Sequence, residues 1–178
     1  MILLLNGAFG IGKTTVARAL VARLPRAVLY DPELVGIALQ RVTRVDDFQD
    51  LRAWRRLTIL GLRATRAFWP NVVVPMAFSN GAYLQEIVRG VSRFEPRVLH
   101  FCLVAPVDVV HRRLANRGED ALKSAWQYRR ASECCDAHAS DEFATRVDAA
   151  DRTSDEIAQA IADEIANQSR PTMTNPAQ

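Results

Sequence analysis

The sequence has only two lysines, Lys13 and Lys123, among its 23 basic residues. It also lacks any long basic block, and 20 acidic residues nearly balance the basic ones, so the sequence pI of about 9.0 does not indicate nucleic-acid binding. In a chain that otherwise uses arginine, each lysine position calls for a specific explanation.

No run of about 18 apolar residues occurs, which excludes a transmembrane helix of ordinary length. The three cysteines and three histidines are not spaced as metal ligands or as a disulfide framework, so we expect a reducing, cytoplasmic environment. The apolar residues 1–5 have no basic start and lead directly into a glycine-rich loop. They therefore predict a buried strand and not a signal peptide.

Short β-type runs alternate with helical stretches, which is typical of a parallel sheet covered by helices. We expect strands at residues 1–5, 27–30, 71–75 and 98–104, and a candidate fifth at 143–147. Helices are expected at residues 13–24, 47–69, 83–94, 107–117 and 155–167, and a further helix passes through residues 128 and 135. The helix at 155–167 has a Thr153–Glu156 capping box. Without repeats or long linkers, we expect one domain over residues 1–167, a lid near 117–135 and a disordered tail over 168–178.

The residues from Gly7 to Thr14 match the phosphate-loop pattern G-x-x-x-x-G-K-[ST] at every defined position. Glycines let the backbone turn successive amide N–H groups toward a phosphate, and the following helix adds the positive end of its dipole. Lys13 can then reach the β- and γ-phosphates of ATP, and the Thr14 hydroxyl can coordinate Mg²⁺. A chance glycine-rich turn is the alternative, but an apolar strand before the loop and an amphipathic helix after it favour nucleotide binding. The expected nucleotide-binding residues are Gly7, Ala8, Phe9, Gly10, Ile11, Gly12, Lys13, Thr14 and Thr15.

Asp31 follows the second strand, where ligands of α/β sheets collect. A carboxylate at this place can accept the proton of an acceptor hydroxyl or hold the water shell of Mg²⁺. Because Pro32 follows it, Asp31 can also cap a helix, and the two roles are compatible. Glu33 is interpreted as a charge favoured at a helix start. The third strand ends without an acidic residue, which argues against a motor ATPase or a GTPase switch.

An R-x-x-x-R pair, Arg113 and Arg117, lies on one face of a predicted helix. Arginine binds phosphate oxygens through two donors at once and stacks on bases, so we expect Arg113 to contact the nucleotide and Arg117 to stabilise the transferring phosphoryl group. Arg129 and Arg130 are candidates for closing over the phosphates from the other side. The pattern does not separate them, and we take Arg130 as the catalytic candidate. The alternative for all four is a solvated surface in an arginine-rich chain.

The order of a phosphate loop, a carboxylate after the second strand and an arginine pair before a lid is similar to that of shikimate, gluconate and nucleoside monophosphate kinases. The finer sequence resembles the tunicamycin-resistance ATP-binding proteins from Met1 to about Arg130. The matching stretches lie at residues 5–14, 30–36, 46–49, 54–55, 74–76 and 100–105. This resemblance implies a three-layer α/β/α P-loop fold, with a five-stranded parallel sheet in the order 2-3-1-4-5 and a helical lid.

The same resemblance implies ATP-dependent resistance to the nucleoside antibiotic tunicamycin, by phosphorylation of the drug or a related molecule. Drug sequestration without chemistry and a metabolic kinase of the shikimate or gluconate type remain alternatives. Relatives are expected to carry a longer amphipathic C-terminal segment that touches membrane, whereas this sequence has a polar tail, so we do not expect membrane association. Nothing in the sequence separates a monomer from a homodimer.

The acceptor is expected to lie against the segment between the second and third strands. Gln49 and Arg55 could bind sugar or phosphate oxygens there, and Met76 and Phe78 could form a wall just after the third strand. The alternative for this segment is a buried helical stripe, which we prefer for Trp54. The placement of these substrate residues rests on topology alone.

Overall fold

The structure, a computed structural model, describes residues 1–43, 45–116, 121–140, 143 and 145–168. Its five strands form one sheet in the order β2-β3-β1-β4-β5, and every neighbouring pair is parallel. The α/β class and the strand order predicted from the sequence are therefore confirmed. The strands are β1 (Ile2–Gly7), β2 (Ala27–Leu29), β3 (Asn71–Met76), β4 (Val98–Val104) and β5 (Arg146–Asp148).

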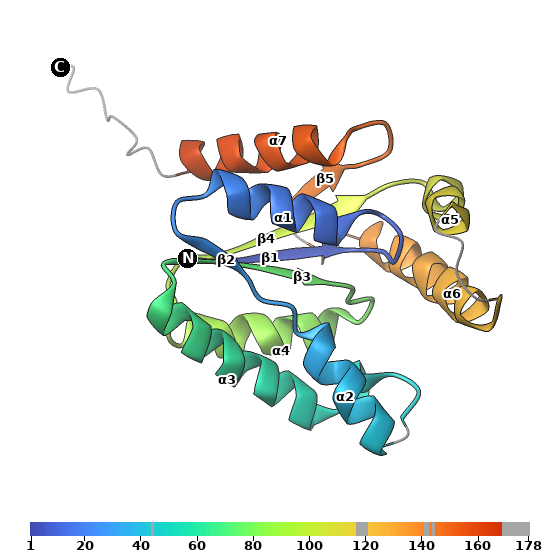
Figure 1. The fold of residues 1–178 in the computed structure, drawn as a ribbon, viewed down its shortest axis with the longest axis horizontal. Helices are drawn as coiled ribbons and strands as arrows, with labels where there is room; N and C mark the ends of the chain where they lie inside the picture. The colour runs from blue at the N-terminus through green and yellow to red at the C-terminus, as the bar shows by residue number, and fades with distance from the viewer. Residues whose placement is uncertain (44, 117–120, 141–142, 144, 169–178) are drawn as a thin grey trace.

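Helices cover both faces of the sheet, with α1 (Lys13–Arg23) and α7 (Ser154–Asn167) on one face and α3 (Arg52–Phe68) and α4 (Gly81–Ser92) on the other (Figure 1). The remaining helices gather near the carboxyl ends of the strands, where a parallel sheet places its ligands. They are α2 (Glu33–Thr43), the 3-10 helix η1 (Phe48–Asp50), α5 (Val107–Ala115) and α6 (Ala121–His138).

Alternate residues of the central strand serve two separate cores, because successive side chains of a strand point to opposite faces. Leu3 and Leu5 of β1 pack beneath α1 and α7. Ile2 and Leu4 pack with the residues of α3 and α4. All four are fully buried, as expected of a central strand in a sheet with both faces covered.

Three features differ from the sequence-based expectations. The helix expected over residues 47–69 is divided, because Asp47 caps η1 by accepting the Gln49 N–H at 2.8 Å and Leu51 is extended before α3 begins. Helix α2 was expected only as a helix start after Asp31, and it extends to Thr43. The fifth strand lies at residues 146–148 instead of 143–147.

The capping box of α7 is confirmed: the Thr153 side chain accepts from the Glu156 N–H, and the Glu156 carboxylate accepts from the Thr153 N–H. Residues 117–120 of the expected lid and most of the tail expected at 168–178 lie outside the described residues. Within the described ranges, none of the helices is both long and apolar enough to cross a bilayer.

Candidate nucleotide and acceptor site

The phosphate loop joins β1 to α1 through two glycines with positive φ, Gly10 at 86° and Gly12 at 104°. Few other residues adopt this conformation, and it leaves Gly12 at the helix start with no side chain capping α1. The amides of the first helical turn are therefore available to an anion, as the motif predicts. A cavity of about 110 Å³ lies here, lined by Phe9, Gly10, Gly12, Lys13, Thr14, Thr15, Asp31, Glu33 and Pro75.

Lys13 is held over this loop. Its Nζ donates to the Ala8 carbonyl at 2.9 Å and lies 5.3 Å from the centre of the Phe9 ring. The side chain is buried, whereas Thr14 and Thr15 are exposed at the cavity. The one lysine that the motif requires is thus positioned beside the amide cradle by the loop itself.

Two carboxylates, Asp31 and Glu33, face Lys13 across the cavity. Asp31 Oδ1 accepts the Glu33 N–H at 3.0 Å, so Asp31 orders the start of α2 while its carboxylate lines the phosphate cavity. Both roles considered for Asp31 from the sequence are compatible with this position. Glu33 was interpreted only as a helix-start charge. Glu33 follows Asp31 by two residues, just after β2. This closeness was the sequence feature that could have placed Glu33 at the cavity.

Burial raises the pKa of Glu33; nearby Lys13 opposes the shift, and Asp31 and Asp47 add to it. A carboxyl group with a raised pKa beside a phosphate cavity is suited to accept a proton from a hydroxyl. Glu33 is therefore a second candidate for the base, beside Asp31.

The residues present fit a magnesium site that is completed by phosphate. The Thr14 hydroxyl and the Asp31 carboxylate are the hard oxygen ligands that Mg²⁺ prefers, and both line the phosphate cavity. Among the described residues, no group of three or more His, Cys, Asp and Glu side chains could hold a metal by itself. Mg²⁺ commonly binds in this way, through one or two protein ligands, water and phosphate oxygens.

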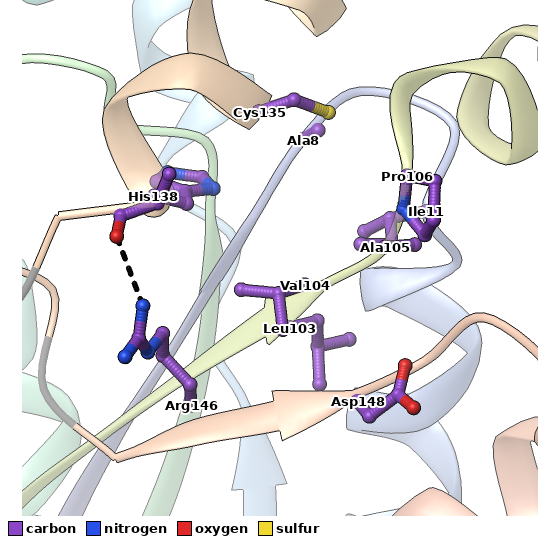
Figure 2. Close-up of a pocket in the computed structure, with 11 residues that line it drawn as sticks. Ala8, Ile11, Leu103, Val104, Ala105, Pro106, Cys135, His138, Arg146 and Asp148 are labelled. Atoms are coloured by element: carbon purple, nitrogen blue, oxygen red, sulfur yellow. Dashed lines mark hydrogen bonds between the residues drawn. The ribbon is translucent and has the colours of Figure 1, made fainter.

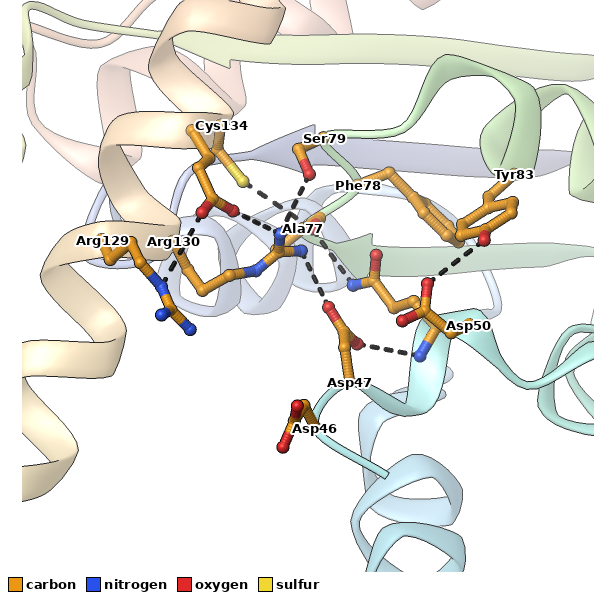
Figure 3. Close-up of polar contacts among 12 residues, drawn as sticks. Asp46, Asp47, Asp50, Ala77, Phe78, Ser79, Tyr83, Arg129, Arg130 and Cys134 are labelled. Carbon is orange, nitrogen blue, oxygen red and sulfur yellow. Dashed lines mark hydrogen bonds and ion pairs between the residues drawn. The ribbon is translucent and has the colours of Figure 1, made fainter. Parts of the chain in front are cut away.

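A second cavity, of about 290 Å³, is lined mainly by polar side chains, several of which Figure 3 shows. The rings of Phe9 and Trp126 meet edge to face, with centroids 5.3 Å apart. Because Phe9 lines the phosphate cavity and Trp126 lines the polar one, the two cavities adjoin at this contact. We call the second one the acceptor cavity; its lining is Asp46, Asp47, Gln49, Asp50, Ser79, Asn80, Tyr83, Trp126, Arg129, Arg130 and Glu133.

Arg130 reaches from α6 across the acceptor cavity. Its guanidinium lies 2.9 Å from the Asp47 carboxylate and 2.6 Å from that of Glu133, and it donates to Ser79 Oγ at 3.2 Å (Figure 3). Arg129 is exposed and lies 3.8 Å from Glu133. The structure thus separates two arginines that the sequence left equivalent: Arg130 is the one built into the site.

Gln49 and Arg55 contact each other at one wall of this cavity. Gln49 lines it and donates from Nε2 to the Ala77 carbonyl at 3.1 Å. Arg55 is buried behind it, paired with Glu86 at 2.7 Å and stacked 4.1 Å from the centre of the Tyr83 ring. Arg55 also donates to the Gln49 carbonyl, so it holds the wall in position instead of lining the cavity.

Met76 and Phe78 are placed differently from the expected wall. Both are fully buried in the core beneath the sheet, and Phe78 packs 5.8 Å from Trp54, ring centre to ring centre. Neither side chain lines the acceptor cavity. The backbone of Phe78 instead forms hydrogen bonds with the Asn6 side chain and His138, which joins β1, the end of β3 and α6.

Arg113 and Arg117 have different outcomes. Arg113 donates to three backbone carbonyls, those of Ile11 at 3.2 Å, Ala149 at 2.8 Å and Ala150 at 2.9 Å. It therefore ties the phosphate loop to the segment after β5. Arg117 lies outside the described residues.

A third cavity, of about 300 Å³, lies between the phosphate loop, the end of β4, β5 and α6 (Figure 2). Its walls are largely apolar, with Ile11, Leu103 and Pro106 among them, and Arg146 and Asp148 come from β5. Helix α6 contributes to this cavity and to the acceptor cavity through different residues. Cys135 of α6 also lines this cavity, and burial raises the pKa of its thiol, which disfavours a thiolate nucleophile there.

The fold agrees with those of solved structures. The tunicamycin resistance protein of Deinococcus radiodurans is 26% identical to this chain and superposes with a TM-score of 0.76, covering 93% of this chain and 95% of its own. A gluconokinase from Sinorhizobium meliloti (14% identical, TM-score 0.62, 94% and 97% covered) and a shikimate kinase from Acinetobacter baumannii (17% identical, TM-score 0.62, 96% and 95% covered) share the fold.

No curated protein sequence matches the chain. The resemblance predicted from the sequence motifs is nevertheless confirmed by the structural similarity to the tunicamycin resistance protein. The family model described as AAA domain matches residues 2–132, which is well over half of the chain. The protein therefore belongs to the AAA domain family, and its fold is that of the P-loop kinases.

Proposed function

We propose that the protein is a Mg²⁺–ATP-dependent phosphotransferase that acts on a hydroxyl group of a small molecule. The observation that carries this proposal is a pair of neighbouring cavities, a phosphate cavity with Lys13 and two carboxylates, and a polar cavity whose wall contacts that of the first through Phe9 and Trp126. A kinase needs this arrangement, because it must hold a phosphate and an acceptor hydroxyl in line.

The residues divide the work by their chemistry. The loop amides and Lys13 bind the phosphates and stabilise charge on the transferring group. Thr14 and Asp31 hold Mg²⁺, which neutralises phosphate charge when it is bound. Asp31 or Glu33 orients the acceptor hydroxyl and takes its proton. Arg117 is the candidate for a second positive charge near the transferred group, because the Arg130 guanidinium is already paired with Asp47 and Glu133.

The acceptor we propose is tunicamycin or a related nucleoside-like molecule. The support is the similarity to a tunicamycin resistance protein over nearly the whole of both chains. It is strengthened by the acceptor cavity, which combines two aromatic side chains, Trp126 and Tyr83, with several hydrogen-bonding side chains. Such a combination suits a sugar or nucleoside, which presents a flat face and many hydroxyl groups.

The test is to incubate the purified protein with Mg²⁺, ATP and tunicamycin and to search by mass spectrometry for a drug heavier by one phosphoryl group. A Lys13→Ala variant is the control, and its product should be absent. Intact drug that is retained only when ATP is bound would favour sequestration. Transfer to shikimate or gluconate in a parallel panel, with none to tunicamycin, would favour a metabolic kinase.

A further inference from the structure

The charges around the acceptor cavity restrict the acceptor further, provided that the proposed function holds. Among the residues that the structure describes, the lining contains four carboxylates, from Asp46, Asp47, Asp50 and Glu133, and two guanidiniums, from Arg129 and Arg130. The excess of two negative charges is unfavourable for an acceptor that carries a carboxylate or a phosphate.

The Arg130 guanidinium does not offset this excess, because carboxylates already pair with it. Arg130 is only 13% exposed, and its guanidinium is shared between Asp47 at 2.9 Å and Glu133 at 2.6 Å. An anionic acceptor would have to displace one of these carboxylates, which would then face the anion in the same cavity. Burial and two existing partners therefore make Arg130 a poor anion receptor. Arg129, the other lining arginine, is 67% exposed and lies 3.8 Å from Glu133, so solvent screens its charge.

Arg55, behind the cavity wall, is committed to partners as Arg130 is. It is paired with Glu86 at 2.7 Å, donates to the Gln49 carbonyl and lies under the Tyr83 ring. The carboxylates Asp46 and Asp50, in contrast, are exposed at the cavity, and Asp50 accepts a hydrogen bond from the Tyr83 hydroxyl at 3.1 Å. Carboxylate oxygens accept from hydroxyl and ammonium groups and give no hydrogen bond to another carboxylate.

We propose that the acceptor cavity selects uncharged or cationic polyhydroxylated molecules and rejects acids, and that the Asp47–Arg130–Glu133 cluster sets this selectivity. The proposal makes a shikimate- or gluconate-type acceptor unfavourable for this protein, although kinases of both acids share its fold. The charge selectivity comes from the Arg130 guanidinium, which is neutralised by the carboxylate of Asp47, the cap of η1, and by that of Glu133 in α6.

Three open-chain probes that differ only at C1 isolate the charge: gluconate with a carboxylate, glucitol with a hydroxymethyl group and glucamine with an ammonium group. Their binding to the protein loaded with a non-hydrolysable ATP analogue and Mg²⁺ is measured by calorimetry at low ionic strength. We expect glucamine to bind at least as tightly as glucitol, and gluconate to bind about tenfold more weakly than glucitol, since like charges repel in a partly desolvated cavity.

The Asp47→Asn/Glu133→Gln double variant is expected to reverse the order, because it frees the Arg130 guanidinium. Gluconate should then bind about tenfold more tightly than to the unaltered protein, and glucamine more weakly. Asparagine at position 47 retains the side-chain oxygen that accepts the Gln49 N–H. If the double variant does not fold, the single variant Glu133→Gln replaces it in the same measurement, because residue 133 lies on the exposed face of α6. Asp136→Asn is the matched control, an exposed carboxylate of α6 that does not line the cavity.

Gluconate binding as tightly as glucitol to the unaltered protein would overturn the proposal, as would binding of none of the three probes. An unchanged order in the double variant would remove the role of the cluster. Phosphoryl transfer is followed separately with ATP. Ordered binding without transfer would refute the kinase function and keep the charge selectivity, whereas transfer to gluconate would refute the selectivity and keep the kinase.

Discussion

The core between the sheet and the layer of α1 and α7 is built from aliphatic side chains, such as Leu3, Val16 and Ile161. The layer on the other face, below the sheet in Figure 1, buries polar and charged groups as well, among them Gln49, Arg55 and Thr58. The difference follows from how each side forms its part of the site. The phosphate loop binds with backbone amides, whereas the acceptor cavity is shaped by side chains held through ion pairs.

A site made of backbone has a local sequence signature, since a few glycines and one helix start define it. A site made of paired side chains has none, because its partners come from distant segments: 83 residues separate Asp47 from Arg130 in the chain. Substitutions that disturb the two kinds of site should therefore have different effects on ATP affinity and on stability.

Gly10→Ala is expected to disrupt the phosphate side most. The residue has a φ of 86°, and an added Cβ would lie 2.6 Å from Leu114 Cγ, so strain and a clash with α5 act together. We expect ATP affinity to fall by about 100-fold or more and the free energy of unfolding to fall by about 3 kcal/mol. Calorimetry and chemical denaturation measure the two.

Gly12→Ala is the control for that variant. Its φ is 104°, but the nearest atom to an added Cβ is Ser154 Oγ at 3.8 Å, so only the backbone strain remains. We expect a loss of stability of about 1–2 kcal/mol. Equal losses in both variants would contradict the role assigned to the contact with Leu114.

Arg55→Met should destabilise the side-chain layer without touching the phosphate loop. The substitution removes the partner of Glu86, the donor to the Gln49 carbonyl and the stacking on Tyr83. We expect the free energy of unfolding to fall by about 2–3 kcal/mol, since a buried donor and an ion pair are lost together. ATP affinity should change less than twofold. Arg56→Met, an exposed neighbour, should cost less than about 0.5 kcal/mol; a similar loss in both would show that burial is not the cause.

The phosphate loop and the capping box could be predicted because each depends on residues that are near one another, and the alternation of strands and helices indicated a parallel sheet. The strand order was implied by the family resemblance. It did not locate the acceptor wall. Met76 and Phe78 follow β3 as expected, but the burial of their side chains depends on contacts with Trp54 and the rest of the lower core. The choice of Arg130 over Arg129 depends on the position of Asp47, 83 residues away, which no local pattern encodes.

His100 of β4, which is partly buried, makes the layer below the sheet sensitive to acid. Burial lowers the pKa of His100 from 6.5 to about 4, with His138 adding to the shift, and its Nε2 is buried without a hydrogen-bond partner. Because the folded state disfavours the imidazolium, the stability contribution is complete above pH 6.5 and is lost as the pH falls from 6.5 toward 4.

His100→Gln removes this titration and keeps a polar side chain, and His100→Leu removes the unpaired nitrogen as well. Between pH 7.5 and pH 5, the unaltered protein should lose about 2 kcal/mol more free energy of unfolding than either variant. Urea denaturation at the two pH values measures this difference. Parallel pH dependence in all three proteins would show that other groups cause the acid sensitivity.

Thr153→Ala should have the smallest effect and should be confined to stability. The Thr153 side chain accepts from the Glu156 N–H at 3.2 Å at the start of α7, away from the acceptor cavity. Its loss should lower the free energy of unfolding by about 1 kcal/mol, and Thr153→Ser should recover most of it, because serine caps a helix equally well. Acceptor binding should not change. If it does, the α1–α7 layer and the acceptor layer are coupled through the sheet, and the separation drawn between the two faces does not hold.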